Sequence, residues 1–198
     1  MRQSINLRVS ALVVALGLGL GSVSVQALVL PGQPAPAAVM SGAVEVGFSP
    51  EGDAGQLVEK VIANARSSIR LAAYSFTSPS VVRALVAAKR RGVDVAVLVD
   101  EKNNLQEDRS GKGRAALNLL VNAGIPTRTI RVYPIHHDKY VVVDGQTVET
   151  GSFNYSEAAA RRNSENAIVI WRDSALAKVY LEHWQSRWVQ GVDFQSTY

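Results

Sequence analysis

Residues 137–154 read HDKYVVVDGQTVETGSFN, and this stretch decides the fold around it. Two largely apolar runs, 137–143 and 147–150, stand on either side of the dipeptide Asp144-Gly145. An Asp-Gly pair favours a tight turn in which both residues take a positive φ, the turn that best suits a β-hairpin. The stretch therefore predicts two antiparallel strands, one over each run.

Outward from this hairpin, predicted strands alternate with predicted helices from about residue 44 onward. Further strands are expected at 44–48, 69–74, 93–99, 126–130 and 166–171. Helices are expected at 55–65, from Ser78-Pro79 to Gly92, and at 115–123, 156–162 and 174–190, with a polar loop at 100–113. This alternation is typical of an α/β domain, so we expect a mixed β-sheet flanked by helices.

The N-terminal part of the chain differs in composition from the rest. Residues 1–27 run from a basic start through an unbroken apolar stretch to small residues, the order of a secretory signal peptide. An uncleaved membrane anchor is the alternative, but the apolar stretch is shorter than the ~20 residues of a membrane span. Residues 28–43 form a Pro/Ala-rich leader, and the domain is expected at 44–198. We therefore expect an exported protein, periplasmic or secreted.

The charge balance is mild. The chain contains 21 Lys and Arg, 17 Asp and Glu, and no Cys. Without Arg2 and Arg8, the charged residues of the expected signal peptide, 19 basic residues face 17 acidic ones, a net charge of +2. Such a balance permits nucleic-acid binding but does not argue for it. The lack of cysteine excludes disulfides and thiolate zinc sites.

The predicted hairpin brings together groups suited to a phosphate. His137 and Lys139 are two residues apart, so in a strand both side chains point to the same face. The turn then returns Gly151, Ser152 and Asn154 beside them. The small Gly and Ser allow an anion to approach the backbone closely, Lys139 supplies positive charge, and Ser152 and Asn154 supply neutral donors.

His137 is the candidate nucleophile, because a neutral imidazole nitrogen attacks phosphorus directly and forms a covalent intermediate. Asp144 lies at the turn, where Asp is favoured for structural reasons, so we expect a structural role for it and for Gly151. No set of His, Asp and Glu has convincing ligand spacing, so no metal or other cofactor is expected.

These residues form the pattern H-x-K-x4-D-x6-G-S-x-N, which resembles the HKD signature of the phospholipase D superfamily. The resemblance covers about residues 44–188, is best at 133–171, and points to the small, single-motif bacterial endonucleases. It implies a metal-independent phosphodiesterase that cuts DNA without sequence preference through a phosphohistidine. It also implies that Glu165, an acid that follows the G-S-x-N element, orients the ring of His137.

One motif supplies half of the active site that this resemblance implies, because superfamily chemistry uses two histidines. One attacks the phosphorus, and the other protonates the leaving oxygen. His136 would point to the opposite face of the strand, and His183 falls in the helix at 174–190, where a structural or surface role is expected. We therefore expect a homodimer in which His137 of each protomer faces the other.

The sequence leaves the substrate of the protein open. Arg161 and Arg162 follow the G-S-x-N element and are candidate contacts to a nucleic-acid backbone, although both also suit a solvated helix end. A phospholipase D-type hydrolase of phospholipids is the main alternative function. A non-catalytic nucleic-acid-binding module is the second, against which the intact His137, Lys139 and Asn154 argue. The residues do not discriminate DNA from RNA.

Overall fold

The computed structural model describes residues 42–51 and 53–197; the predicted signal peptide and all but the end of the leader lie outside them. The strands are β1 (Val44–Ser49), β2 (Ser68–Ala73), β3 (Asp94–Asp100), β4 (Thr127–Ile130), β5 (Lys139–Val143), β6 (Thr147–Gly151), β7 (Glu165–Ile170) and β8 (Val192–Asp193). The helices are α1 (Asp53–Asn64), α2 (Pro79–Arg90), the π-helix η1 (Lys102–Glu107), α3 (Lys112–Asn122), α4 (Glu157–Arg161) and α5 (Ser174–Trp188). Within the described ranges, no helix has the length and apolarity needed to cross a bilayer.

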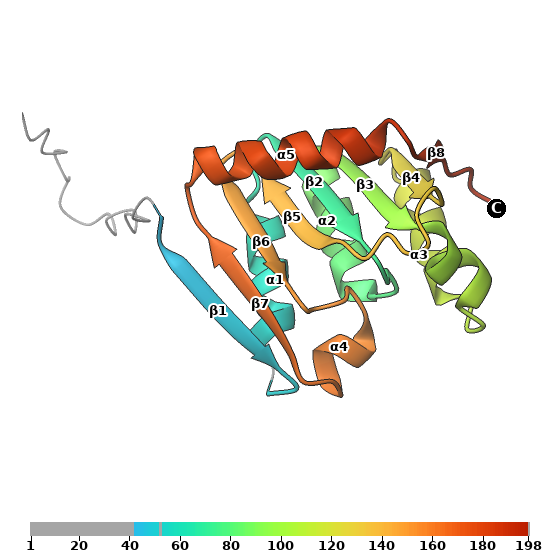
Figure 1. Cartoon of the computed structure of the whole chain (residues 1–198), viewed down its shortest axis with the longest axis horizontal. Helices are drawn as coiled ribbons and strands as arrows, with labels where there is room; N and C mark the ends of the chain where they lie inside the picture. Colours follow the sequence, from blue (N-terminus) through green and yellow to red (C-terminus); the bar gives the residue numbers. More distant parts are fainter. Residues whose placement is uncertain (1–41, 52, 198) are drawn as a thin grey trace, which may run out of the picture. The chain divides into compact units, whose positions relative to one another are not determined.

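The strands form one mixed sheet in the order β1-β7-β6-β5-β2-β3-β4-β8 (Figure 1). Strands β2, β3 and β4 are parallel and are joined through helices, as crossover connections require. The β5–β6 hairpin and the strands beyond it are antiparallel. This arrangement confirms the predicted α/β fold with a mixed sheet.

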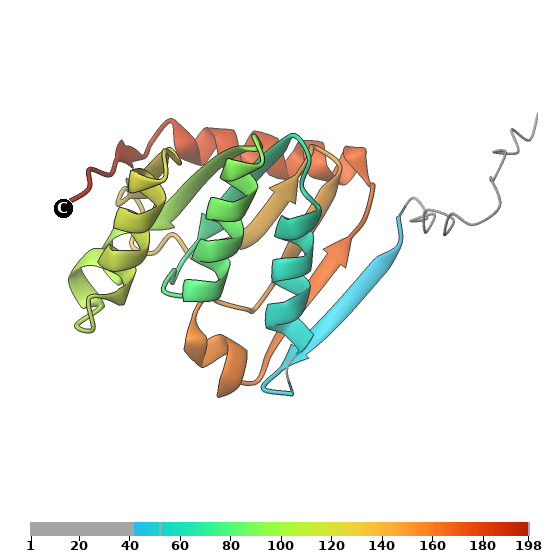
Figure 2. The same cartoon turned by 180° about the vertical axis from the view of Figure 1, so that it is seen from behind.

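Helices cover both faces of the sheet. Helices α1, α2 and α3 lie over one face (Figure 2), and α5 runs across the other (Figure 1). Successive side chains of a strand point to opposite faces, so Leu71 and Val141 join the larger core, whereas Ala72 and Val142 join the smaller core under α5. The central strands are therefore buried on both sides, which explains why their sequences read as unbroken apolar runs.

Local signals act as the sequence predicts. Ser78 caps α2, because its hydroxyl accepts a hydrogen bond from the backbone N–H of Val81, and Pro79 occupies the first helical position. At the hairpin turn, Asp144 has a φ of 54° and Gly145 a φ of 62°. These left-handed conformations are the ones that the Asp-Gly pair favours. The hairpin prediction is confirmed.

The first strand of the hairpin is shorter than predicted. It begins at Lys139, so His137 lies in the segment before the strand, and the argument that both side chains share a strand face is wrong. The reason is the lack of a partner: Lys139 pairs with Ala73, the last residue of β2, and no strand continues beyond it. The backbone here bonds to side chains instead, since the N–H of His136 donates to Asp100.

Two further elements were not predicted. The polar loop expected at 100–113 contains η1, and its Asn104 is fully buried. The amide of Asn104 accepts from the N–H of Phe76 and donates to the carbonyl of Tyr74, so it fixes the segment that follows β2. The short strand β8 after α5 adds an edge beside β4. Neither element has the periodic apolar pattern from which strands and helices are predicted.

Candidate active site

The motif residues gather at one end of the central strands, where β2 and β6 end and β5 and β7 begin (Figure 1). The strand register produces this arrangement, because Lys139 pairs with Ala73, and Gly151 pairs with Ala167. Glu165 is the first residue of β7, so it lies at the same end. Four strand ends thus bring together residues that are up to 28 positions apart in the motif region.

Lys139 lies buried at the centre of this end of the sheet. Its Nζ donates a hydrogen bond of 2.9 Å to the carbonyl of His137 and lies 5.4 Å from the centre of the Tyr74 ring. Burial lowers the pKa of the Lys139 amine, while the carboxylates of Glu165 and Asp138 act in the opposite direction. The His137 carbonyl, the Tyr74 ring and the two carboxylates therefore hold the amine in the site.

His137 is exposed, in contrast to its buried neighbour His136. The His137 ring stands edge-on to the ring of Tyr74, with 4.7 Å between the centroids and 63° between the planes. Asn104 in turn fixes Tyr74, since its amide donates to the Tyr74 carbonyl at 2.6 Å. A nucleophile needs both accessibility and a defined position, and this arrangement supplies both.

Glu165 contacts Ser152 rather than His137. Its Oε2 accepts a hydrogen bond of 2.7 Å from the Ser152 hydroxyl, and its Oε1 accepts one of 3.0 Å from the amide of Asn163. Among the described residues of the single chain, no hydrogen bond joins Glu165 to His137, so the expected pairing is not formed here. The carboxylate instead orients the Ser152 hydroxyl and interacts electrostatically with Lys139.

The Gly151–Asn154 segment is fixed against β7. A Cβ on Gly151 would lie 2.3 Å from the carbonyl oxygen of Asn166, so only glycine fits there. Ser152 exchanges hydrogen bonds with Asn166, through its N–H to Oδ1 and through its Oγ from the Asn166 N–H. The Oδ1 atom of Asn154 is buried and has no hydrogen-bond partner in the part of the chain that the structure describes. An amide oxygen accepts hydrogen bonds, so only the NH2 group of Asn154 is suited to a phosphate oxygen.

Asp144 lies at the far end of β5 from Lys139. Its carboxylate accepts hydrogen bonds from the backbone N–H groups of Arg66, Ser67 and Ser68 and from the Ser67 hydroxyl. Burial by itself would raise the pKa of Asp144, but these donors outweigh it and lower the pKa. The carboxylate thus ties the hairpin turn to the start of β2, as a structural residue does.

Arg161 and Arg162 lie at the end of α4, the short helix that follows the motif. Both are exposed, and Arg161 Nε lies 2.6 Å from Glu157 Oε1 one turn away. A phosphate contact by Arg161 therefore competes with that ion pair. Arg162 has the more open position for a substrate.

A cavity of about 530 Å³ opens beside the motif on the α5 side of the sheet. His137, Lys139, Thr150, Tyr180 and His183 contribute to its walls. The His183 Nε2 atom lies 2.9 Å from Asp138 Oδ2, so this histidine belongs to the site region, although the sequence suggested only a structural or surface role. The two residues are 45 positions apart in the sequence, so no local pattern predicts this contact.

His136 has a different environment. Its ring is buried, and its Nδ1 lies 3.5 Å from Asp138 Oδ2. Burial lowers the pKa of His136, against the opposing effect of Asp138 and Asp100. A buried ring of this kind is poorly placed to exchange protons with a substrate. Across residues 42–51 and 53–197, no cluster of three or more His, Cys, Asp or Glu is arranged to hold a metal ion.

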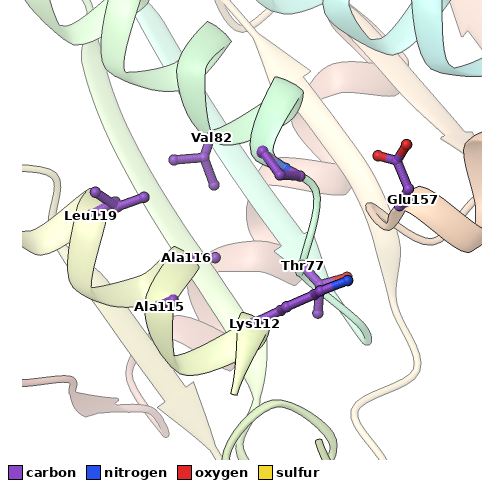
Figure 3. A pocket seen from close by; sticks show the side chains of 8 residues that line it. Thr77, Val82, Lys112, Ala115, Ala116, Leu119 and Glu157 are labelled. Atoms are coloured by element: carbon purple, nitrogen blue, oxygen red, sulfur yellow. The ribbon is translucent and has the colours of Figure 1, made fainter. Parts of the chain in front are cut away.

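A second cavity, of about 320 Å³, lies on the opposite side of the sheet between α2, α3 and α4 (Figure 3). Val82, Ala116 and Leu119 supply an apolar wall, while Lys112 and Glu157 lie toward its rim. None of the motif residues lines it. It contains no histidine, so the cavity beside His137 is the candidate active site.

Comparison with known proteins now identifies the family. The family described as "Cardiolipin synthase, PLD-like domain" matches residues 58–188, which include the whole motif. The chain belongs to the phospholipase D superfamily. The family that the sequence predicted is therefore confirmed.

Superfamily relatives match over most of the domain. A phospholipase D of Rickettsia bellii is 38% identical over 140 residues, which are 71% of this chain and 66% of the relative. The mitochondrial cardiolipin hydrolase of Xenopus laevis is 34% identical over 63% of this chain and 56% of its own length. The chain thus spans slightly less than two thirds of the curated relatives that it matches.

A crystal structure shares the full fold of this superfamily member. Nuc, a phospholipase D family member from Salmonella typhimurium, is 53% identical, with a TM-score of 0.75. The match covers 78% of this chain and 99% of Nuc. The described domain therefore matches almost the whole length of Nuc.

Proposed function

We propose that the chain is a metal-independent endonuclease that cuts DNA without sequence preference. The observation that carries the proposal is that His137, Lys139 and Gly151, the residue before Ser152, line one open cavity where the central strands end. The similarity to Nuc over almost the whole of that protein supports the nuclease branch. Export through a cleaved signal peptide within residues 1–27 belongs to the same proposal.

The proposed reaction has two steps. A ring nitrogen of His137 attacks the phosphorus, and the bond from phosphorus to the leaving oxygen breaks as a second histidine gives that oxygen a proton. Lys139, Ser152 and Asn154 bind the non-bridging oxygens and stabilise the charge that builds on them. The second histidine then takes a proton from water, whose oxygen attacks the phosphohistidine and releases His137.

The second histidine is proposed to be His137 of a partner protomer. Within the described chain, the ring of His136 is buried, and His183 is paired with Asp138. In a dimer with a two-fold axis close to His137, the His137 ring of each protomer serves as the second histidine of the other. Light scattering should give a dimer at assay concentration. Refolding the wild type with a large excess of His137→Ala should lower activity per wild-type chain; unchanged activity contradicts the shared site.

The test of the reaction is nicking of supercoiled plasmid by the purified protein in excess EDTA. We expect cleavage by the wild type and none by His137→Ala. Lys178→Met, which removes an exposed lysine paired with Glu182 on α5, serves as a control that should keep wild-type activity. Activity that disappears in EDTA and returns with a divalent ion contradicts metal independence.

Hydrolysis of phospholipids is the second candidate function. The relatives from Rickettsia bellii and Xenopus laevis carry the names phospholipase D and mitochondrial cardiolipin hydrolase. The mixed polar and apolar cavity beside His137, with Val179 and Tyr180 in its wall, suits a group larger than a phosphate. Release of phosphatidic acid from phosphatidylcholine or cardiolipin vesicles, without plasmid nicking, favours this function. Nucleic-acid binding that persists with no reaction on either substrate favours the non-catalytic module.

A further inference from the structure

Glu149 is a carboxyl group enclosed in the protein core. It lies on β6, two residues before Gly151, and is 1% exposed. Its neighbours on the adjoining strands are Val141 and Val169, which are apolar. The hydroxyl of Tyr155 donates a hydrogen bond of 2.9 Å to its Oε2. Within the described residues no cation pairs with Glu149, and an isolated buried carboxylate is costly, so the neutral acid is favoured.

Tyr155 connects this carboxyl group to the motif. It directly follows Asn154 and is fully buried. Its carbonyl accepts hydrogen bonds of 2.9 Å from the N–H groups of both Thr77 and Ser78, at the connection between β2 and α2. Its ring also stands edge-on to Phe76. Tyr155 is therefore the point where the motif segment is joined to the connection that carries Tyr74, the ring beside His137.

We propose that Glu149 is a positioning residue for phosphodiester cleavage. Its carboxyl oxygen accepts from the Tyr155 hydroxyl and so holds Tyr155, and Tyr155 holds Asn154 on one side and the β2–α2 connection on the other. Glu149 touches no substrate in this role and acts through Tyr155. The effect on cleavage rests on the proposed function. The protonation state of the Glu149 carboxyl does not, because it is measured without a substrate.

The role has a direct consequence for pH. Burial raises the pKa of Glu149 to about 8, and the Tyr155 hydroxyl opposes this effect. Tyr155 is the titratable group that faces Glu149, and Tyr140 acts in turn on Tyr155. The folded-state pKa lies above the ordinary value of 4.5, so the neutral form stabilises the fold fully below that value. This contribution is lost as the pH rises to about 8, where a buried charge begins to form beside Tyr155.

The first experiment is the pH profile of single-turnover nicking for the wild type, Glu149→Gln and Tyr155→Phe. Glutamine keeps the size and an acceptor for Tyr155 but does not ionise. We expect the wild-type rate to fall as the pH rises through about 8 and Glu149→Gln to keep its rate at least one pH unit further. Tyr155→Phe removes the bond through which Glu149 acts, so its rate should be lower than that of the wild type already at neutral pH.

Glu45→Gln is the matched control, because Glu45 is an exposed carboxylate paired with Lys60. It should reproduce the wild-type profile. An alkaline decline that is identical in Glu149→Gln and the wild type overturns the inference. So does a full wild-type rate of Tyr155→Phe at neutral pH.

A second measurement separates this inference from the proposed function. Infrared spectra near neutral pH should contain the carbonyl band of a protonated carboxylic acid in the wild type and not in Glu149→Gln. The Tm of the wild type should fall more steeply than that of Glu149→Gln between pH 5 and 8, a window set by the raised pKa. If both results hold while plasmid is not cut, the nuclease proposal fails and the neutral carboxyl stands. If neither result holds, the inference fails whatever the substrate.

Discussion

The two ends of β5 both carry motif residues, yet their surroundings are opposite. At one end, the Asp144 carboxylate accepts hydrogen bonds from three backbone N–H groups and a hydroxyl. At the other end, His137 is exposed, and the nearby Asn154 has a buried oxygen without a partner. A carboxylate with all its donors stabilises the fold, whereas a buried polar atom without a partner costs stability. One motif therefore contains both a structural anchor and the proposed reaction centre.

The largest expected effect is at the reaction end. His137→Ala should lower plasmid cleavage by about a thousandfold or more, because the nucleophile of a covalent mechanism has no substitute. The Tm should stay close to that of the wild type, since the ring is exposed and its contact is with Tyr74. Residual activity within tenfold of the wild type would remove His137 from the role of nucleophile.

A smaller loss is expected at Lys139. Lys139→Met keeps much of the side-chain volume but removes the charge that stabilises the phosphate oxygens, so kcat should fall by about a hundredfold or more. Cleavage by Lys178→Met, measured in parallel, should stay at the wild-type level, because that lysine lies on the exposed side of α5. Equal losses in the two variants would indicate a general effect of charge rather than a role in the site.

The anchor end should show the reverse pattern. Asp144→Ala leaves the N–H groups of Arg66, Ser67 and Ser68 without their acceptor and should lower the free energy of unfolding by about 2–3 kcal/mol. Activity per folded molecule should change little. Because the pKa of Asp144 is lowered, its stabilisation is present above the ordinary value of 3.8 and is lost as the pH falls below it. Denaturant unfolding at neutral and acidic pH measures both effects, and a loss of activity without loss of stability would contradict the anchor.

The smallest expected effect concerns the substrate contacts beyond the motif. Arg162→Ala should weaken DNA binding several-fold and reduce the dependence of log Kd on log salt by about one phosphate contact. Arg161→Ala should have a weaker effect, since that side chain is already paired with Glu157. Fluorescence anisotropy at several salt concentrations distinguishes the two. A larger effect for Arg161 would reverse the assignment.

The sequence predicted those features that depend on short stretches. The Asp144-Gly145 turn, the Ser78 cap and the alternation of strands and helices each need only a few neighbouring residues, and all are present. The start of β5 was predicted two residues early, because the end of the partner strand at Ala73 decides it. Strand limits depend on pairing, and a single stretch carries no information on its partner.

The candidate site was predicted in its residues more than in its contacts. Lys139, Gly151 and Glu165 do lie at the same end of the central strands, but Glu165 binds Ser152 rather than His137. The roles of Asn104 and Glu149 had no sequence signal, since polar residues in a loop or near a strand end are usually solvated. Helices on both faces of the sheet bury such positions, and this burial depends on the tertiary structure rather than on the neighbouring residues.

The stacked rings of Trp184 and Trp188 give the protein an internal optical reporter. Their centroids are 4.6 Å apart at an angle of 18°, and the guanidinium groups of Arg70 and Arg128 lie over them. Two indoles at this separation couple their excited states, so the far-ultraviolet circular dichroism should contain a paired signal of opposite signs. Because Arg70 and Arg128 belong to β2 and β4, that signal persists only while α5 stays docked on the sheet, and its decay in denaturant follows this single helix in a chain without any added label.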